Sequence, residues 1–144
     1  MRLVIDTNVL VSALLTPGRT AARLLGYMAT GGLTPIVDDR VLAEYADVLA
    51  RPKLSIAPAA AREMLAVIGT AGTHVLSAEV HLPFAIPDPK DLPFAELAVR
   101  AHADGLVTGN DRHFADMRAR GPVPVWTPAE ALAEVAKARG QGGS

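Results

Sequence analysis

The chain has 144 residues, half of them hydrophobic, and its 14 Lys and Arg residues nearly balance its 15 Asp and Glu residues. This length fits one compact domain with its own core, and the composition argues against disorder. A net charge of -1 argues against a whole-molecule electrostatic grip on nucleic acid, although a local basic rim remains open. Because there is no cysteine, disulfides, thiolate zinc sites and cysteine nucleophiles are excluded.

Five short, largely apolar runs alternate with segments of helical pattern and predict strands. They are residues 3–5, 35–37, 74–76, 106–108 and 123–126. Because these runs are continuous rather than alternating, both faces of each strand should be covered by helices. Strands that alternate with helices favour a mostly parallel sheet. We therefore expect an α/β fold, a three-layer α/β/α sandwich around a central, mostly parallel sheet.

Capping residues and prolines place the helices between these strands. The expected helical segments begin at Thr20, at Asp38 or Asp39, at Pro58, near Asp91 and at Thr127-Pro128. The last of these is the clearest, because a Thr N-cap, a Pro at the first helical position and a Glu three residues after the Thr form a capping box.

A single domain is expected over residues 1–139, followed by a flexible tail, Gly-Gln-Gly-Gly-Ser, over residues 140–144. No apolar run approaches the ~20 residues of a membrane-spanning helix, and the N-terminus lacks a signal-peptide pattern. We expect a cytoplasmic protein without a membrane segment.

Polar side chains follow three of the five predicted strands. Asp6 comes directly after the first, Asp38 and Asp39 follow the second, and Asn110 and Asp111 follow the fourth. The carboxyl ends of parallel strands share one edge of a sheet, and ligands bind at that edge. The two acids after the second strand fit helix N-caps better, and Asp111 could also cap a short helix. Asp6 lies inside an apolar run, where an unpaired carboxylate is costly, and this favours a functional role.

Periodicity separates the acids on the predicted helices. In the second helix, Glu44 lies at the edge of the apolar stripe and can reach toward a cleft, whereas Asp47 lies on the solvent side. Near the fourth helix, either Asp88 or Asp91 can be the functional acid or the helix cap. Glu96 stands four residues before an arginine, the spacing of an exposed ion pair, so we expect it at the surface.

Carboxylates that converge in one cleft must be neutralised. Negative charges on Asp6, Glu44, Asp91 and Asp111 would repel one another unless protons or cations reduce their charge. Cations are the simpler answer, and an all-oxygen set of ligands suits Mg²⁺ or Mn²⁺. Such ions activate water and stabilise charged oxygens in phosphodiester hydrolysis. The sequence therefore predicts a metal-dependent hydrolase of phosphodiesters.

The positive side chains give a weaker indication of the substrate. Three of the four histidines lack metal-ligand spacing and fit structural or exposed positions. His113 differs because it follows Asp111 at the presumed rim of the cleft. We predict that Arg112 and His113 contact substrate phosphate, with Lys90 and Arg19 as further candidates.

Four segments occur in order along the chain, namely VIDTNVLVSALL at 4–15, LAEYADVLARPKL at 42–54, DPKDLPFAELAVRAHADGLVTGNDRHF at 88–114 and VPVWTPAEAL at 123–132. Together they resemble the PIN-domain ribonucleases, and in particular the VapC-like toxins of toxin–antitoxin systems. A single motif such as Asp-Thr-Asn is weak, but four in order at family-like separations are specific. The resemblance implies the α/β/α fold that the strand pattern indicates independently.

By position, the resemblance implies that three acids of the family's catalytic metal site fall on Asp6, Glu44 and Asp91. The family often has Thr-x-Asp after the fourth strand, whereas this chain has Thr-Gly-Asn there, with Asp111 one residue later. Either Asn110 fills the fourth position as a neutral oxygen ligand or Asp111 does. The number of occupied metal positions depends on which of the two it is.

The same resemblance implies a cofactor, supporting residues and partners. Four side chains would orient the acids or waters through hydrogen bonds, Thr7, Asn8, Thr108 and Asn110. The implied activity is that of a Mg²⁺- or Mn²⁺-dependent endoribonuclease, which hydrolyses RNA with metal-activated water. A cognate antitoxin protein and a homodimer are the implied partners.

Three other interpretations compete with a ribonuclease. The departure at Asn110 leaves open a PIN-like module that binds protein or RNA with weak or no catalysis. A haloacid-dehalogenase-like phosphatase also places Asp after its first strand, but it needs a second Asp where this chain has Asn8. A receiver domain would need paired acids near the first strand and a late lysine, and the chain has neither.

Overall fold

A five-stranded parallel sheet forms the centre of the molecule, in the order β3-β2-β1-β4-β5. The structure is a computed structural model in which residues 1–142 are described. Its strands are β1 (Arg2–Ile5), β2 (Thr34–Val37), β3 (Thr73–His74), β4 (Gly105–Val107) and β5 (Val125–Trp126). The predicted parallel sheet is therefore confirmed, although β3 and β5 are shorter than the apolar runs suggested.

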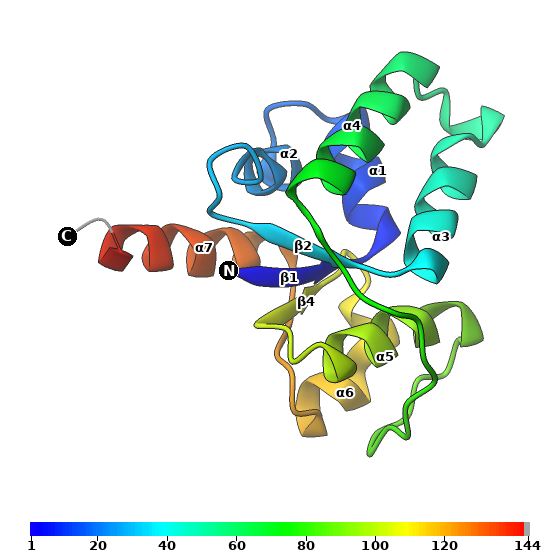
Figure 1. The fold of residues 1–144 in the computed structure, drawn as a ribbon, viewed down its shortest axis with the longest axis vertical. Coiled ribbons are helices and arrows are strands. Elements are labelled where there is room, and N and C mark those ends of the chain that lie inside the picture. The colour runs from blue at the N-terminus through cyan, green and yellow to red at the C-terminus, as the bar shows by residue number, and fades with distance from the viewer. Residues whose placement is uncertain (143–144) are drawn as a thin grey trace.

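Helices cover both faces of the sheet, so the predicted α/β/α sandwich is also confirmed (Figure 1). The α-helices of the described chain are α1 (Thr7–Leu15), α2 (Thr20–Gly26), α3 (Asp39–Leu49), α4 (Pro58–Ala71), α5 (Leu92–Arg100), α6 (Ala115–Arg120) and α7 (Pro128–Gly142). Three short 3₁₀ helices join them, η1 (Pro52–Leu54), η2 (Pro89–Asp91) and η3 (Asp111–Phe114). Helices α1 to α4 lie on one side of the sheet and α5 and α6 on the other, while α7 packs against α2 and the β4–β5 edge.

The core is tightest around the central strand β1. Leu3, Val4 and Ile5 are almost completely buried because strands lie on both sides of β1 and helices cover both faces. The buried Tyr45 of α3 donates its hydroxyl to the Ile5 carbonyl and so ties that helix to the carboxyl end of β1. Its ring packs near that of Phe94 on α5, with centroids 6.2 Å apart. The end of β1 is thus held from both helical layers.

Two helices have N-terminal caps formed by residues that the sequence pattern predicts. The Asp38 carboxylate accepts from the Val41 backbone N at 2.9 Å and caps α3. At the start of α7, the Thr127 N donates to the Glu130 carboxylate and the Glu130 N donates to the Thr127 hydroxyl, which is the predicted capping box.

The C-terminal end differs from expectation in one respect. Helix α7 runs to Gly142, three residues into the segment for which we expected a flexible tail. The other two residues of that expected tail, 143 and 144, lie outside the described residues.

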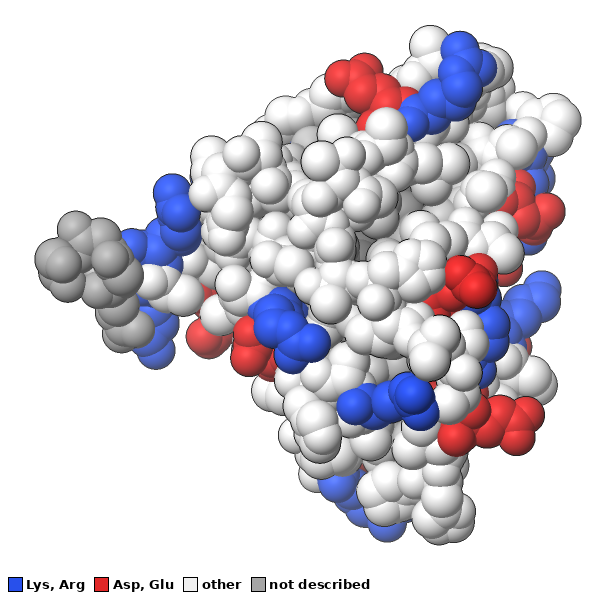
Figure 2. Space-filling model, in the orientation of Figure 1, with Lys and Arg blue, Asp and Glu red and all other residues white. Residues whose placement is uncertain are grey.

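Across residues 1–142 no helix is both long and apolar enough to cross a membrane. On the face shown in Figure 2, basic and acidic side chains are scattered among uncharged residues, and no large patch of one charge is visible.

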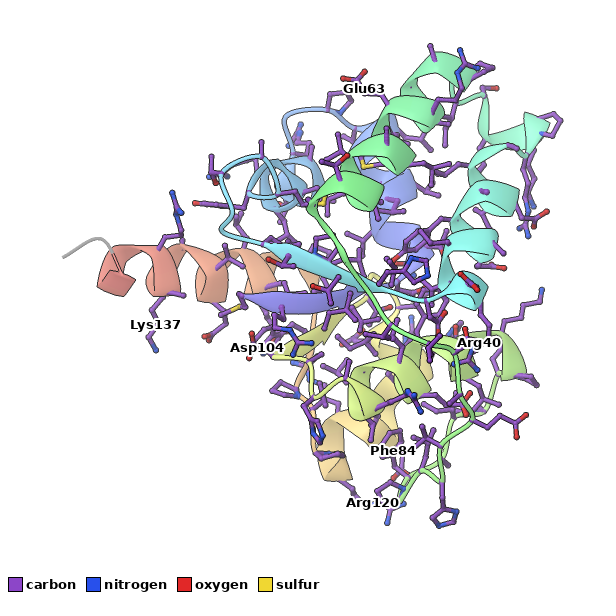
Figure 3. The ribbon with its side chains drawn as sticks, in the orientation of Figure 1. Arg40, Glu63, Phe84, Asp104, Arg120 and Lys137 are labelled. Carbon is purple, nitrogen blue, oxygen red and sulfur yellow. The ribbon has the colours of Figure 1, made fainter. Side chains whose placement is uncertain are left out.

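Glu96 is not at the surface, so that prediction is wrong. Its side chain is 9% exposed, accepts from Arg40 Nη1 at 3.0 Å and also accepts from the Val80 N at 2.7 Å. Arg40, labelled in Figure 3 where α3 begins near α5, also pairs with Asp38 at 3.2 Å. The pattern within the helix could not show this, because the segment between β3 and η2 covers this side of α5 in the folded protein. Asp47 is exposed as predicted.

Replacing Glu96 with Ala is expected to destabilise the fold by about 2 kcal/mol or more, because the Val80 N–H and one arm of the Arg40 guanidinium lose their acceptor. Urea unfolding of the variant and the wild type measures this difference. Glu79→Ala, which removes an exposed carboxylate from the adjoining segment, is the matched control and should change stability little. Equal effects of the two substitutions would show that the Arg40–Glu96 pair does not support the fold.

Candidate metal centre

The order of the strands reverses between β1 and β4, and two predicted site residues meet at this point. Asp6 follows β1 and Thr108 follows β4. The Asp6 N donates to the Val107 carbonyl at 2.8 Å, which extends the strand pairing by one residue. The Thr108 hydroxyl donates to Asp6 Oδ2 at 2.8 Å, and both residues are buried. This is the position at which open parallel sheets bind ligands.

The loop after β4 is held to Asp6 through Asn8. The Asn8 Nδ2 donates to Asp6 Oδ2 at 3.2 Å, and its Oδ1 accepts from the Gly109 N at 2.9 Å. A Cβ at Gly109 would lie 3.3 Å from Asn8 Oδ1, so glycine permits this close approach. The Asn110 N donates to the Thr108 hydroxyl at 3.0 Å. Donors from α1 and from the β4 loop therefore fix the orientation of the Asp6 carboxylate.

Asp91 ends η2 and precedes α5, and its carboxylate is mostly covered, with 13% of the side chain exposed. Within the described chain its Oδ2 is buried and makes no hydrogen bond. The Nδ1 of His113 lies 3.3 Å from this oxygen, which is within ion-pair range when the imidazole is protonated. Asp88 lies close to both residues. One ligand atom from each of Asp88, Asp91 and His113 lies within 4.8 Å of the others, so the three side chains form one group.

The charges of these acids act on one another. Burial raises the pKa of Asp6 from 3.8 to about 6, the hydrogen bond from Thr108 opposes this, and the negative charge of Asp91 adds to it. Burial also raises the pKa of Asp91, with further contributions from the charges of Asp88 and Glu44 against the opposing effect of His113. A bound divalent cation would offset the energetic cost of burying these carboxylates and would reduce the repulsion between them. The unpartnered Asp91 oxygen and the surrounding oxygen donors fit such an ion.

The other two predicted acids lie further out. Glu44 is half-buried on α3, close enough for its charge to raise the pKa of Asp91. Asp111 begins η3, is 45% exposed and pairs with Arg118 Nη1 at 3.1 Å. Arg118 also pairs with Glu130 at 2.7 Å, so Asp111 belongs to an ionic network that includes the start of α7. Asp6, Glu44 and Asp111 all lie outside the group within 4.8 Å, and the catalytic roles of the four predicted acids remain predictions.

The predicted substrate-binding residues line a hollow beside the acids. Arg112 and His113 are exposed and border a space of about 440 Å³ together with Pro87, Asp88 and Pro89. Lys90 is exposed on the neighbouring η2. Thr7, a predicted supporting residue, is buried, and its hydroxyl makes no hydrogen bond in the described chain.

Sequence reasoning treated Asp88 and Asp91 as alternatives, whereas the structure brings both into one cluster. Residues three apart lie on the same side of a 3₁₀ helix, and Asp88 caps η2 while Asp91 ends it. The Asp-Pro-x-Asp spacing was the signal for this arrangement. His113 was predicted as a phosphate contact only, and its closeness to Asp91 comes from the fold of η3 against η2.

A family model described as a PIN domain matches residues 2–112, more than half of the chain. The chain belongs to the PIN-domain family. Among solved structures this PIN domain is similar to VapBC2 from Rickettsia felis, solved bound to a DNA fragment from their promoter. The match has a TM-score of 0.57 and 19% sequence identity, and covers 88% of this chain and 98% of that chain. At this identity it shows the shared fold. Comparison with curated proteins gives no match.

The pKa of Asp6 predicts a pH-dependent stability in the presence of a chelator. The folded carboxyl keeps its proton up to about pH 6, whereas the unfolded one loses it near 3.8, so stability falls as pH rises through this window. At neutral pH the ionised group costs about 3 kcal/mol. Asp6→Asn lacks this cost, so its stability relative to wild type should increase between pH 4 and 6 and then level off.

Urea unfolding at a series of pH values with excess EDTA measures this difference. Asp47→Asn is the control, because it removes an exposed carboxylate that lies outside the acidic group. A difference between Asp6→Asn and wild type that does not vary with pH would contradict a raised pKa at Asp6.

Proposed function

We propose that this PIN domain is a Mg²⁺- or Mn²⁺-dependent endoribonuclease, the toxin component of a toxin–antitoxin pair. The observation that carries the proposal is the buried Asp6 carboxylate at the strand-order reversal, near Asp91, whose Oδ2 is buried without a hydrogen-bond partner in the described chain. Two acids in such a place need a cation, and oxygen ligands favour a hard one. Membership of the PIN-domain family supports the nuclease class.

In this proposal Asp6 and Asp91 hold the principal ion, while Glu44 and Asp111 complete or position it. When bound, the ion supplies an activated water and stabilises charge on the phosphodiester oxygens. The hydrogen bonds from Thr108 and Asn8 keep Asp6 oriented for its role.

The chain's own basic groups would hold the RNA. Arg112 and His113 line the hollow next to Asp88, where they can contact the phosphates on either side of the scissile bond. The near-neutral net charge of -1 means that few ion contacts contribute to affinity, so binding should depend only modestly on salt concentration.

A cognate antitoxin, a homodimer and a cytoplasmic location are further parts of this proposal. The fold shared with VapBC2 supports the toxin–antitoxin assignment. The measured mass of the purified protein in solution, alone and with the product of a neighbouring gene, tests the two assemblies.

The first test measures cleavage of a mixed pool of RNA with added Mg²⁺ or Mn²⁺. Asp6→Asn and Asp91→Asn should reduce cleavage to background, because each removes a charged ligand of the principal ion. Asp47→Asn should leave it unchanged, since this residue lies on the exposed face of α3 and pairs with Arg51. Glu44→Gln and Asp111→Asn should give smaller losses.

Cleavage that persists in Asp6→Asn, or that resists EDTA, would contradict the proposal. RNA binding without cation and without cleavage in the wild type would instead support the alternative, a PIN-like module that binds RNA or protein with weak or no catalysis. Calorimetric titration of cation into the same samples separates a lost ion from a lost chemical step.

Thr108→Val keeps the shape of the side chain and removes the hydroxyl that donates to Asp6 and accepts from the Asn110 N. Loss of a hydrogen bond that orients a metal ligand costs roughly 10- to 100-fold in affinity or activity, and we expect a loss of that size in cation affinity. Thr73→Val, in the exposed β3, is the matched control. Equal cation affinities for Thr108→Val and wild type would show that the hydroxyl does not orient Asp6.

A further inference from the structure

Asp88, Asp91 and His113 form a mixed group of two carboxylates and one imidazole, and the charges of Asp91 and His113 act on the nearby Asp6 carboxylate. We propose that Nδ1 of His113 is a cation ligand together with Asp88 and Asp91, in place of the phosphate contact assigned to His113 above, and that this nitrogen makes the centre select Mn²⁺ over Mg²⁺. This inference rests on the proposed metal-dependent function and specifies the chemistry of its ion.

The spacing of the three side chains suits coordination of one ion. Two ligands at right angles, each about 2.2 Å from an ion, lie roughly 3.1 Å apart, and two opposite ligands lie about 4.4 Å apart. The Nδ1 of His113 is 3.3 Å from Asp91 Oδ2, and the ligand atoms of the whole group lie within 4.8 Å of one another. A small inward movement of the exposed imidazole would bring all three into range.

Asp88 and Asp91 each have an oxygen with lone pairs that no hydrogen bond in the described chain uses. Asp91 Oδ2 is buried and makes no hydrogen bond in the described part of the chain, even though the imidazole stands next to it. One oxygen of Asp88 accepts from the Lys90 N at 3.0 Å, which leaves its second oxygen for a ligand.

The backbone holds these side chains in place without an ion. Asp88 caps η2, and Pro89 restricts its first residue, so the two acids face one way. On η3, the His113 N donates to the Asn110 carbonyl at 3.0 Å. The next residue, Phe114, is completely buried in the core and so fixes the backbone beside His113. His113 is 48% exposed, so its imidazole stands at the mouth of the site.

Nitrogen coordination discriminates between the two candidate ions. Mg²⁺ is hard and strongly hydrated and binds oxygen almost exclusively, whereas Mn²⁺, which also takes carboxylate and water ligands, is a first-row transition ion and accepts imidazole more readily than Mg²⁺ does. A centre of carboxylates alone would distinguish the ions less. His113 therefore accounts for a preference that the acids by themselves would not produce.

The test uses the full chain loaded with Mn²⁺ and measures pulsed electron paramagnetic resonance for coupling between the ion and a directly bound nitrogen. Wild type should show this coupling, His113→Gln should lose it, and His81→Gln, which removes an exposed imidazole outside the group, should retain it. By calorimetry, His113→Gln should weaken Mn²⁺ binding by roughly tenfold and Mg²⁺ binding by much less.

Asp88→Asn serves as a second variant, because its amide oxygen can still accept from the Lys90 N and keep η2 capped. It should weaken Mn²⁺ binding while the nitrogen coupling persists at saturating ion. Absence of the coupling in wild type, or its persistence in His113→Gln, would overturn the inference.

RNA cleavage by the same samples separates the two proposals. Cleavage that depends on Asp6 but occurs without nitrogen coupling would leave the ribonuclease in place and reject the role of His113. Nitrogen coupling in a protein whose Asp6→Asn variant still cleaves RNA would reject the proposed function and leave the imidazole-bearing cation position standing.

Discussion

The burial of the Asp6 carboxylate at the end of β1 is the constraint on which the rest of the site depends. A carboxylate with 7% exposure cannot stay ionised in an apolar core without donors or a cation. The donors come from two directions, the Thr108 hydroxyl after β4 and the Asn8 amide on α1. Both require that β1 and β4 be neighbours, so the strand order and the charge of one side chain are parts of the same arrangement.

Glu44 and Asp91 come from the two helical layers, and a partly buried ion pair outside the site links those layers. Arg40 at the start of α3 reaches Glu96 on α5, one helical turn beyond the start of that helix. Glu44 lies one turn further along α3, and Asp91 directly precedes α5. The Arg40–Glu96 pair therefore holds together the two helices that carry the acids, although neither residue belongs to the acidic group.

Features that depend on short stretches of chain could be predicted from the sequence. The apolar runs predicted the strands, the Thr-Pro-x-Glu pattern predicted the capping box of α7, and the apolar context of Asp6 singled out a carboxylate that is buried at the end of β1. Glu96 could not be placed, because the segment that covers it comes from another part of the chain. The pairing of Asp111 with Arg118 is likewise a tertiary contact that helical periodicity does not reveal.

In the proposed metal centre, the choice of residues would balance affinity for a cation against stability without one. Each added carboxylate attracts a cation more strongly but repels its neighbours when no ion is bound. At the predicted fourth acidic position the chain has the neutral Asn110, and the charge of the next residue, Asp111, is compensated by Arg118. The imidazole of His113 stands beside Asp91. A neutral nitrogen ligand adds coordination without adding negative charge. If the proposed ion binds, this composition would allow the chain to fold around Asp6 before the ion is bound, because Arg118 compensates part of the acidic charge.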